Sequence, residues 1–231
     1  MEFMLMFDAY DGSPTPTPEA LAVMGAFARD LARRKKLRRG FPLAVAADAA
    51  TVRVRDGRAV VHDGPFAETK EQVAGVWIID AADRAEALEI ASRIPHTSHG
   101  PTEVHALAGR YGGTDTGKGR PFILLFRMEP GLVPSPEKLR EMIAYGTQLQ
   151  NDGIQFETAP LTDNPPPARL ETRKGEVFVT DGPFVETKEG VGGYSLVRTR
   201  DRAAAIDIAT RYPHAQWGSV EVREILFFDP V

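Results

Sequence analysis

Two histidines stand at equivalent places in a repeated Arg-x-Pro-His pattern, His96 in the first half of the chain and His214 in the second. An imidazole titrates near neutral pH, so each histidine is the best candidate in its half for a general acid or base. Each also follows a proline that should end a helix, and a charged histidine there interacts favourably with the helix dipole. The catalytic and the structural interpretations both remain open.

A second repeated block, Asp-Gly-Pro-Phe-x-Glu-Thr-Lys-Glu, begins at Asp63 and again at Asp181. Asp-Gly-Pro is typical of a turn, and we expect the phenylalanine to fill the core. The polar residues that follow are harder to explain by packing. A glutamate at the mouth of a cavity could accept a proton, and a lysine could hold an anionic group. The alternative is a solvated loop in which these charges pair with one another.

These patterns define a candidate site with one set of residues in each half. Arg93 and Arg211 belong to it because they stand one turn before the histidines, where they could bind an anion or the last carbonyls of the helix. We interpret His96 and His214 as candidate catalytic residues. The candidate ligand-binding residues are Asp63, Glu68, Lys70, Arg93, Asp181, Glu186, Lys188 and Arg211.

No metal or cofactor is expected from the motifs. His96 and His99 have the spacing of a ligand pair on a helix, but Pro95 should end that helix. Trp217 replaces the second of these histidines in the other half. The chain has no cysteine, which excludes disulfides and cysteine-based metal sites. We find no Gly-rich phosphate loop after a strand, no nucleophile elbow and no HExxH motif.

The two halves are copies of one another. A shift of 118 residues places Asp63–His96 on Asp181–His214, with 19 identities in 34 positions, where about two would arise by chance. Each copy is predicted to run strand, helix, hairpin, strand, helix, strand. The candidate residues therefore lie on equivalent elements of two similar units.

The helix that opens each copy has a clear start. Thr17 and Ser135 are N-cap residues, each followed by a proline at the first helical position. The apolar periodicity predicts a buried face that includes Leu21 in the first copy and Leu139 in the second.

The hairpin and the second helix are predicted by equally local signals. Asp56-Gly57 and Lys174-Gly175 have the form of two-residue hairpin turns. Asp83 and Asp201 should cap the second helices, which end before the prolines of the Arg-x-Pro-His pattern.

This order matches the ferredoxin-like split βαβ pattern with an added hairpin. We expect an α+β protein of two tandem ferredoxin-like (dimeric α/β-barrel) domains, residues 1–108 and 121–231, joined by a Gly-rich linker, residues 109–120. Helices would cover one face of each sheet, so the other faces must bury one another. The two sheets should pack face to face as an intramolecular pseudo-dimer.

The repeated block, followed by a helix that ends in Arg-[Ile/Tyr]-Pro-His and a strand with Glu-Val, resembles the DGPF branch of the YCII-related proteins over essentially the whole chain. The resemblance implies a dimeric α/β-barrel fold. Most such proteins are uncharacterised, and DGPF genes often neighbour extracytoplasmic-function sigma factors. The wider group includes enzymes thought to use a His–Asp pair, but residues 21–31 and 139–149 lack its histidine, and Arg93-Ile94 and Arg211-Tyr212 replace its aspartate.

Charge and apolar content limit the classes of partner that we expect for this protein. The net charge of −4 gives no general attraction to nucleic acid, and we interpret the basic run Arg33–Arg39 as the solvated end of a helix. The start of the chain does not resemble a signal peptide, and no stretch of about 20 apolar residues could span a membrane. We therefore expect a cytoplasmic protein without membrane or nucleic-acid partners.

Two functions remain open, and the sequence does not decide whether the protein is an enzyme. The favoured interpretation is a small-ligand-binding or regulatory module, with a small molecule or a sigma-factor-type protein as its partner. The alternative is a small-molecule enzyme that uses acid–base chemistry in the cavity between the two domains. Further homodimerisation of the whole chain is compatible with both.

Overall fold

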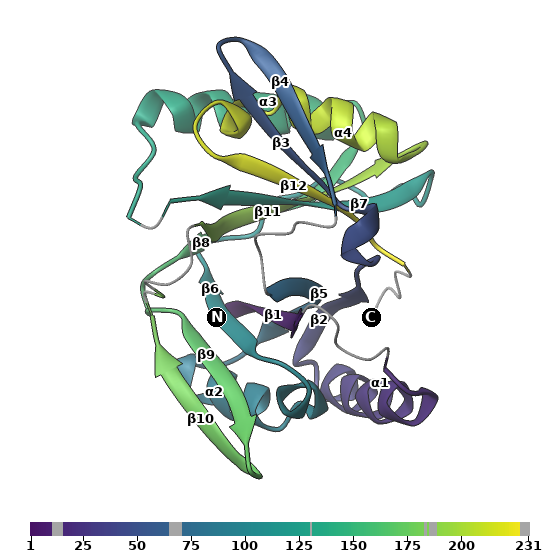
Figure 1. The fold of residues 1–231 in the computed structure, drawn as a ribbon, viewed down its shortest axis with the longest axis vertical. Coiled ribbons are helices and arrows are strands. Elements are labelled where there is room, and N and C mark those ends of the chain that lie inside the picture. Colours follow the sequence, from purple (N-terminus) through teal and green to yellow (C-terminus); the bar gives the residue numbers. More distant parts are fainter. Residues whose placement is uncertain (11–15, 65–70, 130, 183, 185–188, 227–231) are drawn as a thin grey trace.

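The computed structural model describes residues 1–10, 16–64, 71–129, 131–182, 184 and 189–226. Both copies run strand, helix, strand, hairpin, strand, helix, strand (Figure 1). The first copy consists of β1 (Glu2–Tyr10), α1 (Pro18–Arg33), β2 (Leu37–Pro42), β3 (Ala50–Arg55), β4 (Arg58–Asp63), β5 (Glu71–Asp80), α2 (Arg84–Ser92) and β6 (Thr102–Leu107). The second consists of β7 (Arg120–Met128), α3 (Pro136–Asn151), β8 (Gln155–Thr162), β9 (Ala168–Arg173), β10 (Glu176–Asp181), β11 (Gly190–Thr199), α4 (Arg202–Arg211) and β12 (Ser219–Glu224).

The strands form two antiparallel sheets that exchange their hairpins and are joined at one edge, where the end of β6 pairs with the end of β8. The first sheet follows the order β2-β5-β1-β6-β9-β10, and the second follows β8-β11-β7-β12-β3-β4. The β3–β4 hairpin of the first copy therefore extends the sheet of the second copy, because β3 pairs with β12. The β9–β10 hairpin of the second copy extends the first sheet by pairing with β6. The sequence predicts both hairpins but contains no signal for the strand that each one joins.

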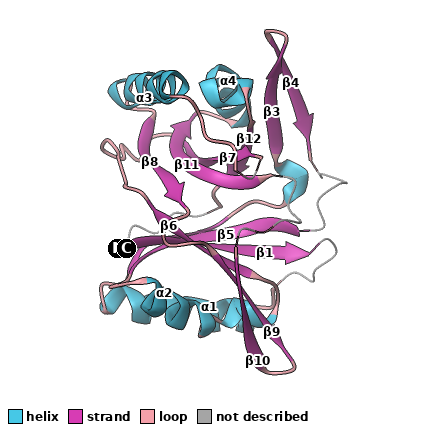
Figure 2. Ribbon diagram, turned by 90° about the vertical axis from the view of Figure 1, so that its left-hand side faces the viewer, coloured by secondary structure: helices cyan, strands magenta, loops and turns pink. Residues whose placement is uncertain are grey.

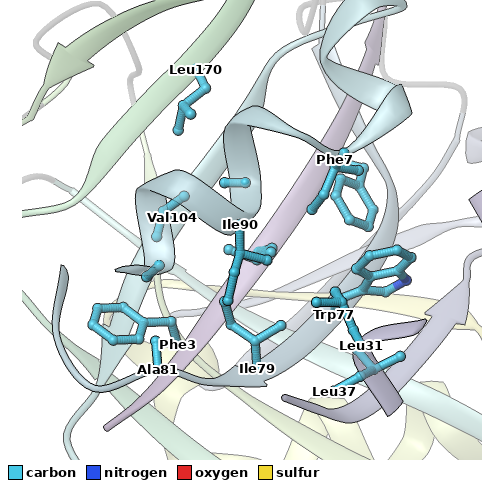
Figure 3. Packing of buried hydrophobic residues seen from close by; sticks show 14 of the residues in the cluster. Phe3, Phe7, Leu31, Leu37, Trp77, Ile79, Ala81, Ile90, Val104 and Leu170 are labelled. Atoms are coloured by element: carbon cyan, nitrogen blue, oxygen red, sulfur yellow. The ribbon is translucent and has the colours of Figure 1, made fainter. Parts of the chain in front are cut away.

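The helices lie outside and the sheets face one another (Figure 2). Alternation along β1 separates two cores. Phe3, Leu5 and Phe7 pack beneath α1 and α2, and Figure 3 shows Phe3 and Phe7 in this core. Met4 and Met6 face the other sheet. The core between the sheets draws side chains from both copies, among them Met4, Met6, Val76, Ile78, Ile123, Leu125, Tyr194 and Leu196. This arrangement confirms the predicted pair of ferredoxin-like units packed face to face.

Each exchanged hairpin also contributes to the helix-side core of the other copy. Leu170 of β9 is fully buried in the core of the first copy (Figure 3). Val52 of β3 is fully buried in the core of the second. Each helix-side core is therefore completed by a side chain of the other copy.

The local predictions are largely confirmed. The hydroxyls of Thr17 and Ser135 accept hydrogen bonds from the first turns of α1 and α3. Asp56 and Lys174 have φ angles of 51° and 52°, in the left-handed region that a two-residue hairpin turn requires. The second helices end before the prolines, each of which begins a 3-10 turn, Pro95–Ser98 or Pro213–Gln216.

Two expectations were wrong. Leu21 and Leu139 are 56% and 46% exposed, because the buried face of each helix begins about one turn later; Phe27 packs against the core of the first copy instead. Strands β2 and β8 were not predicted. The segment Leu37–Pro42 contains arginines, a glycine and a proline, which do not resemble a typical strand, yet it forms β2 and pairs with β5.

The predicted solvated basic run lies partly in β2 and is neutralised by acids nearby. Lys36 pairs with Glu86, and Arg38 pairs with Asp80, both at 2.6 Å. No helix among the described residues is long and apolar enough to cross a membrane.

Candidate functional site

His96 and His214 occupy equivalent and enclosed positions. The Nε2 atom of His96 lies 2.9 Å from the backbone oxygen of Asp8, and that of His214 lies 2.8 Å from the backbone oxygen of Arg127. A carbonyl oxygen can only accept, so each imidazole must carry its proton on Nε2. Both histidines are therefore hydrogen-bond donors to the end of the first strand of their own copy.

The carbonyls that they bind lie at β-bulges. The pairing of β1 with β5 shifts register between Phe7 and Asp8. Such a bulge disrupts the ladder locally, and the histidine supplies a donor where a strand partner is displaced. A ring contact supports each imidazole: His96 lies 5.1 Å from Phe7 and His214 lies 5.2 Å from Phe126, measured between centroids.

A glycine four residues later completes the motif. A Cβ atom on Gly218 would lie 2.4 Å from the oxygen of Arg127 and 2.5 Å from Nε2 of His214. A Cβ atom on Gly100 would lie 2.2 Å from the oxygen of Asp8. The repeated pattern is thus Arg-x-Pro-His-x-x-x-Gly, a structural unit in which the chain passes close to the same carbonyl that the histidine binds.

Burial sets the charge of both histidines. Desolvation lowers the pKa of His214 to about 4, and it lowers the pKa of His96 in the same direction. His214 is therefore neutral at pH 7, and a dipole interaction that needs a charged imidazole does not describe it. Both imidazoles also lie on the helix-facing sides of the sheets, because Phe7 and Phe126 belong to the helix-side cores.

The first aspartate of each repeated block fastens an exchanged hairpin. Asp63, at the end of β4, pairs with Arg202 at the start of α4 in the other copy. Asp181, at the end of β10, pairs in the same way with Arg84 at the start of α2. Arg202 also donates to the carbonyls of Asp48 and Ala49, beside the base of its hairpin.

The remaining candidate residues are not brought together with the histidines in the described structure. Arg93 pairs with Glu89 at 3.9 Å, and Arg211 pairs with Asp207 at 2.6 Å; both pairs lie on exposed helix surfaces. Glu68, Lys70, Glu186 and Lys188 lie outside the described residues.

Arg211 lines a groove that the two copies form together. The groove lies between the β3–β4 hairpin and the end of α4, with a volume of about 610 Å³. We call it the hairpin groove. Its walls include Val54, Gly57 and Ala59 from the hairpin, and Thr210, Arg211 and Gln216 from the second copy, with Asp56 at the turn.

A buried ionic cluster between the sheets was not predicted. Alternation along β12 places Val220 and Val222 in the helix-side core, so Glu221 and Arg223 face inward. The two oxygens of Glu221 bind Arg127 at 2.5 Å and Arg223 at 3.0 Å. Glu103 and His105 are the first-copy counterparts of Glu221 and Arg223. We call Glu221, Arg127, Arg223, Glu103 and His105 the inner charge cluster.

The first-copy half of this cluster is chemically different. His105 lies 2.9 Å from Glu103, which also approaches Arg169 of the exchanged β9 at 3.7 Å. Although burial opposes it, the His105 contact keeps the pKa of Glu103 below its usual range. Against the effect of its burial, nearby carboxylates hold the pKa of Arg127 above its usual range, Glu221 most strongly and then Asp8 and Glu103. The two halves of the cluster therefore interact across the sheets.

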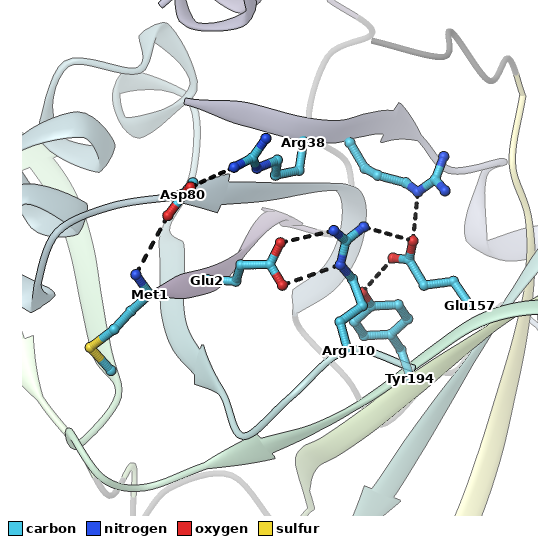
Figure 4. Close-up of polar contacts among 8 residues, drawn as sticks. Met1, Glu2, Arg38, Asp80, Arg110, Glu157 and Tyr194 are labelled. Carbon is cyan, nitrogen blue, oxygen red and sulfur yellow. Dashed lines mark hydrogen bonds and ion pairs between the residues drawn. The ribbon is translucent and has the colours of Figure 1, made fainter. Parts of the chain in front are cut away.

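A further polar group lies at the opposite end of β1. One carboxylate, Glu157, accepts hydrogen bonds from Tyr194 at 2.8 Å, Arg39 at 2.7 Å and Arg110 at 3.1 Å (Figure 4). Arg110 also binds Glu2 at 3.0 Å. Every charge here has a partner, so the group fastens the residues between the copies to both sheets.

A sequence signal for the inner charge cluster exists in the final strands. Thr102–Leu107 and Ser219–Glu224 read Thr-Glu-Val-His-Ala-Leu and Ser-Val-Glu-Val-Arg-Glu, with polar residues at alternate positions. A half-exposed strand has the same pattern, so alternation alone cannot distinguish a buried ionic face from a solvated one.

Comparison with known proteins gives a family for both halves. The model of the YCII-related domain matches residues 1–107 and again residues 122–229. The uncharacterised protein R00369 of Rhizobium meliloti (strain 1021) is 48% identical over 62 residues, which are 26% of this chain and 50% of that protein. The chain thus matches about half the length of this curated relative.

Among solved structures, the chain is similar to that of a chlorite dismutase candidate, TA0507. The sequences are 7% identical, the TM-score is 0.43, and the match covers 98% of this chain and 94% of the other.

Proposed function

Since the chain belongs to the family of YCII-related domains, with one domain in each half, we propose that it is a small-ligand-binding module and that it does not use its histidines for acid–base catalysis. The observation that carries this proposal is the hairpin groove, in which Arg211 stands beside apolar side chains contributed by the other copy.

The position of the histidines argues against the enzymatic alternative. A general base between the sheets needs a free nitrogen within hydrogen-bond reach of a substrate. His96 and His214 lie on the helix sides of their sheets and donate Nε2–H to backbone carbonyls. The space between the sheets holds a core of buried hydrophobic side chains from both copies.

The hairpin groove has the volume of a small-ligand site and offers both apolar and polar groups. Its volume of about 610 Å³ lies within the range of roughly 300–1,000 Å³ that is usual for such sites. Val54 and Ala59 offer apolar surface, and Thr210 and Gln216 offer hydrogen-bonding groups. Arg211 uses Nε and Nη2 on Asp207, and Nη1 has no partner among the described residues. This combination suits a small molecule with an apolar or aromatic body and one anionic group.

Fluorescence titration with 8-anilinonaphthalene-1-sulfonate, an aromatic sulfonate, tests this proposal. Arg211→Gln should weaken binding by about three- to tenfold, because a charge-assisted hydrogen bond is lost. Ala59→Trp should weaken it further by filling the groove. The matched control is Arg93→Gln, which changes the equivalent arginine of the first copy and should leave binding unchanged.

Equal binding by the wild type and both groove variants would rule out the hairpin groove as the site. A fourth variant, His214→Gln, tests the enzymatic alternative, because glutamine keeps an N–H donor but cannot act as an acid or base near pH 7. Sulfonate binding by this variant should equal that of the wild type. The sigma-factor-type partner stays a prediction, and the same groove variants test it in co-purification.

A further inference from the structure

Strand β10 is an unprotected sheet edge. It is the last strand of the first sheet, and all six of its residues, Glu176–Asp181, are exposed. Three apolar side chains in succession show much of their surface: Val177 (39%), Phe178 (48%) and Val179 (49%). In both views the β9–β10 hairpin projects from the body of the protein (Figures 1 and 2).

Proteins usually protect such an edge with prolines, lysines or bulges, and β10 has none of these; its two acidic residues, Glu176 and Asp181, stand at its ends. Its register with β9 is continuous from Glu176 to Asp181. Its inner edge is paired with β9, so alternate N–H and C=O groups along the outer edge face away from the sheet. The backbone is therefore ready to accept another strand, and the apolar side chains favour one of similar composition.

We infer that β10 binds the β10 strand of a second copy of this chain, antiparallel, with Phe178 on the two-fold axis. In this register Val177 faces Val179 of the partner subunit on one side of the new sheet. Phe178 faces Phe178 of the partner subunit on the other side. Cross-strand aromatic and β-branched pairs are the favourable contacts of antiparallel sheets.

The charges in β10 allow this register. Glu176 would face a threonine of the second copy, and Asp181 would face a glycine, so no like charges oppose one another. The equivalent edge strand β4 differs. The same symmetric pairing around Val60 would place Arg58 opposite a histidine, His62, and Ala59 gives a smaller apolar surface than Val177. The two copies have diverged so that one edge suits self-association better than the other.

A strand of six residues forms a small interface, so the dimer should be weak and dependent on concentration. Sedimentation velocity of the full chain should show a reversible rise towards twice the 25.3 kDa of one chain as the concentration approaches about 500 μM. Val179→Lys should abolish that rise, because it buries a charge opposite Val177. Val61→Lys, at the equivalent position of β4, is the matched control and should leave the rise intact.

Disulfide trapping tests the register. The chain has no cysteine, so Phe178→Cys introduces one thiol per chain. Residues that face each other across an antiparallel pair have Cα atoms about 4.5–5.5 Å apart, within reach of a disulfide. Under mild oxidation, Phe178→Cys should form a covalent dimer. Val60→Cys and Thr180→Cys should not, because the first lies in β4 and the second would lie about 13 Å from its symmetry mate.

A wild-type chain that remains monomeric at every concentration would overturn the proposal. This holds also if β10 then proves to bind a strand of another protein. Equal loss of association in Val179→Lys and Val61→Lys would overturn it as well. Sulfonate binding at the hairpin groove involves none of these residues, so the two proposals fail independently.

Discussion

Asp8 and Arg127 occupy equivalent positions at the bulges of the first strands, yet they carry opposite charges. The Asp8 carboxylate of one sheet is among the groups that raise the pKa of Arg127 in the other. Identical residues at these two positions would bring like charges towards one another across the sheets. The divergence of the two copies has therefore made the contact between the sheets electrostatically complementary.

This complementarity predicts a measurable coupling energy. Arg127→Gln alone should lower the free energy of unfolding by about 3 kcal/mol, because Glu221 loses one of its two arginine partners in a buried setting. A double-mutant cycle with Asp8→Asn, followed by urea unfolding, should give a coupling of about 0.5–2 kcal/mol. Strict additivity of the two substitutions would show that the residues do not interact.

The lowered pKa values of the two histidines predict that the protein loses stability in acid. The pKa of His214 is lowered from 6.5 to about 4 by folding, so the unfolded chain binds more protons between these values. The stability that depends on a neutral His214 is fully present above pH 6.5 and is lost as the pH falls towards 4. It is on the order of 3 kcal/mol. His96 acts in the same direction.

Unfolding free energies of the wild type and His214→Gln between pH 4 and 7.5 measure this contribution, since the carboxylates titrate in both proteins. The variant should have a shallower dependence on pH. Parallel curves for the two proteins would contradict a buried neutral His214.

The glycine of the histidine motif should tolerate no side chain. Gly218→Ala places a Cβ atom 2.4 Å from the carbonyl oxygen of Arg127, so the 3-10 turn or the strand must move. We expect a loss of about 2 kcal/mol or more, measured by denaturant unfolding. Gly190→Ala is the control, because a Cβ atom there meets no atom within 4 Å. Equal stability of the two variants would mean that the motif is not tightly packed.

The aspartate of the repeated block should hold the exchanged hairpin in place. Arg202→Ala removes the contacts to Asp63, Asp48 and Ala49, and we expect hydrogen exchange of the β3 and β4 amides to rise by about tenfold. The overall loss of stability should stay near 1 kcal/mol, since the ion pair is largely exposed. Arg200→Ala, two residues earlier, removes an exposed pair with Asp201 and should leave the exchange unaltered.

Local signals in the sequence were sufficient for most of the elements. Thr17 as an N-cap, Asp56-Gly57 as a turn and Pro95 as a helix stop each act through neighbours in the chain, so their effect can be predicted from a few residues. The repeat extended each prediction to a second copy, and the buried face of a one-sided sheet required a partner. The family was predicted from the repeated motifs, and the face-to-face arrangement was predicted from the one-sided sheets.

What could not be predicted depends on partners distant in the chain. The pairing of β3 with β12, and the contact between Arg202 and Asp63, join residues of different copies, and no local pattern encodes either. The inner charge cluster has the alternation of an ordinary exposed strand. The histidine that attracted a catalytic interpretation is enclosed because a bulge in another strand exposes a carbonyl to it.

The exchange of hairpins also determines how the chain must fold as it is synthesised. Thr51 pairs with Glu221, so a ribosome has to add another 170 residues before the partner of β3 emerges. The first copy can collapse early around its helices, but its sheet lacks β9 until the second copy is well under way. Neither half has a complete native state of its own, and long-range pairings of this kind form slowly. The protein should therefore acquire its structure in one late, cooperative step.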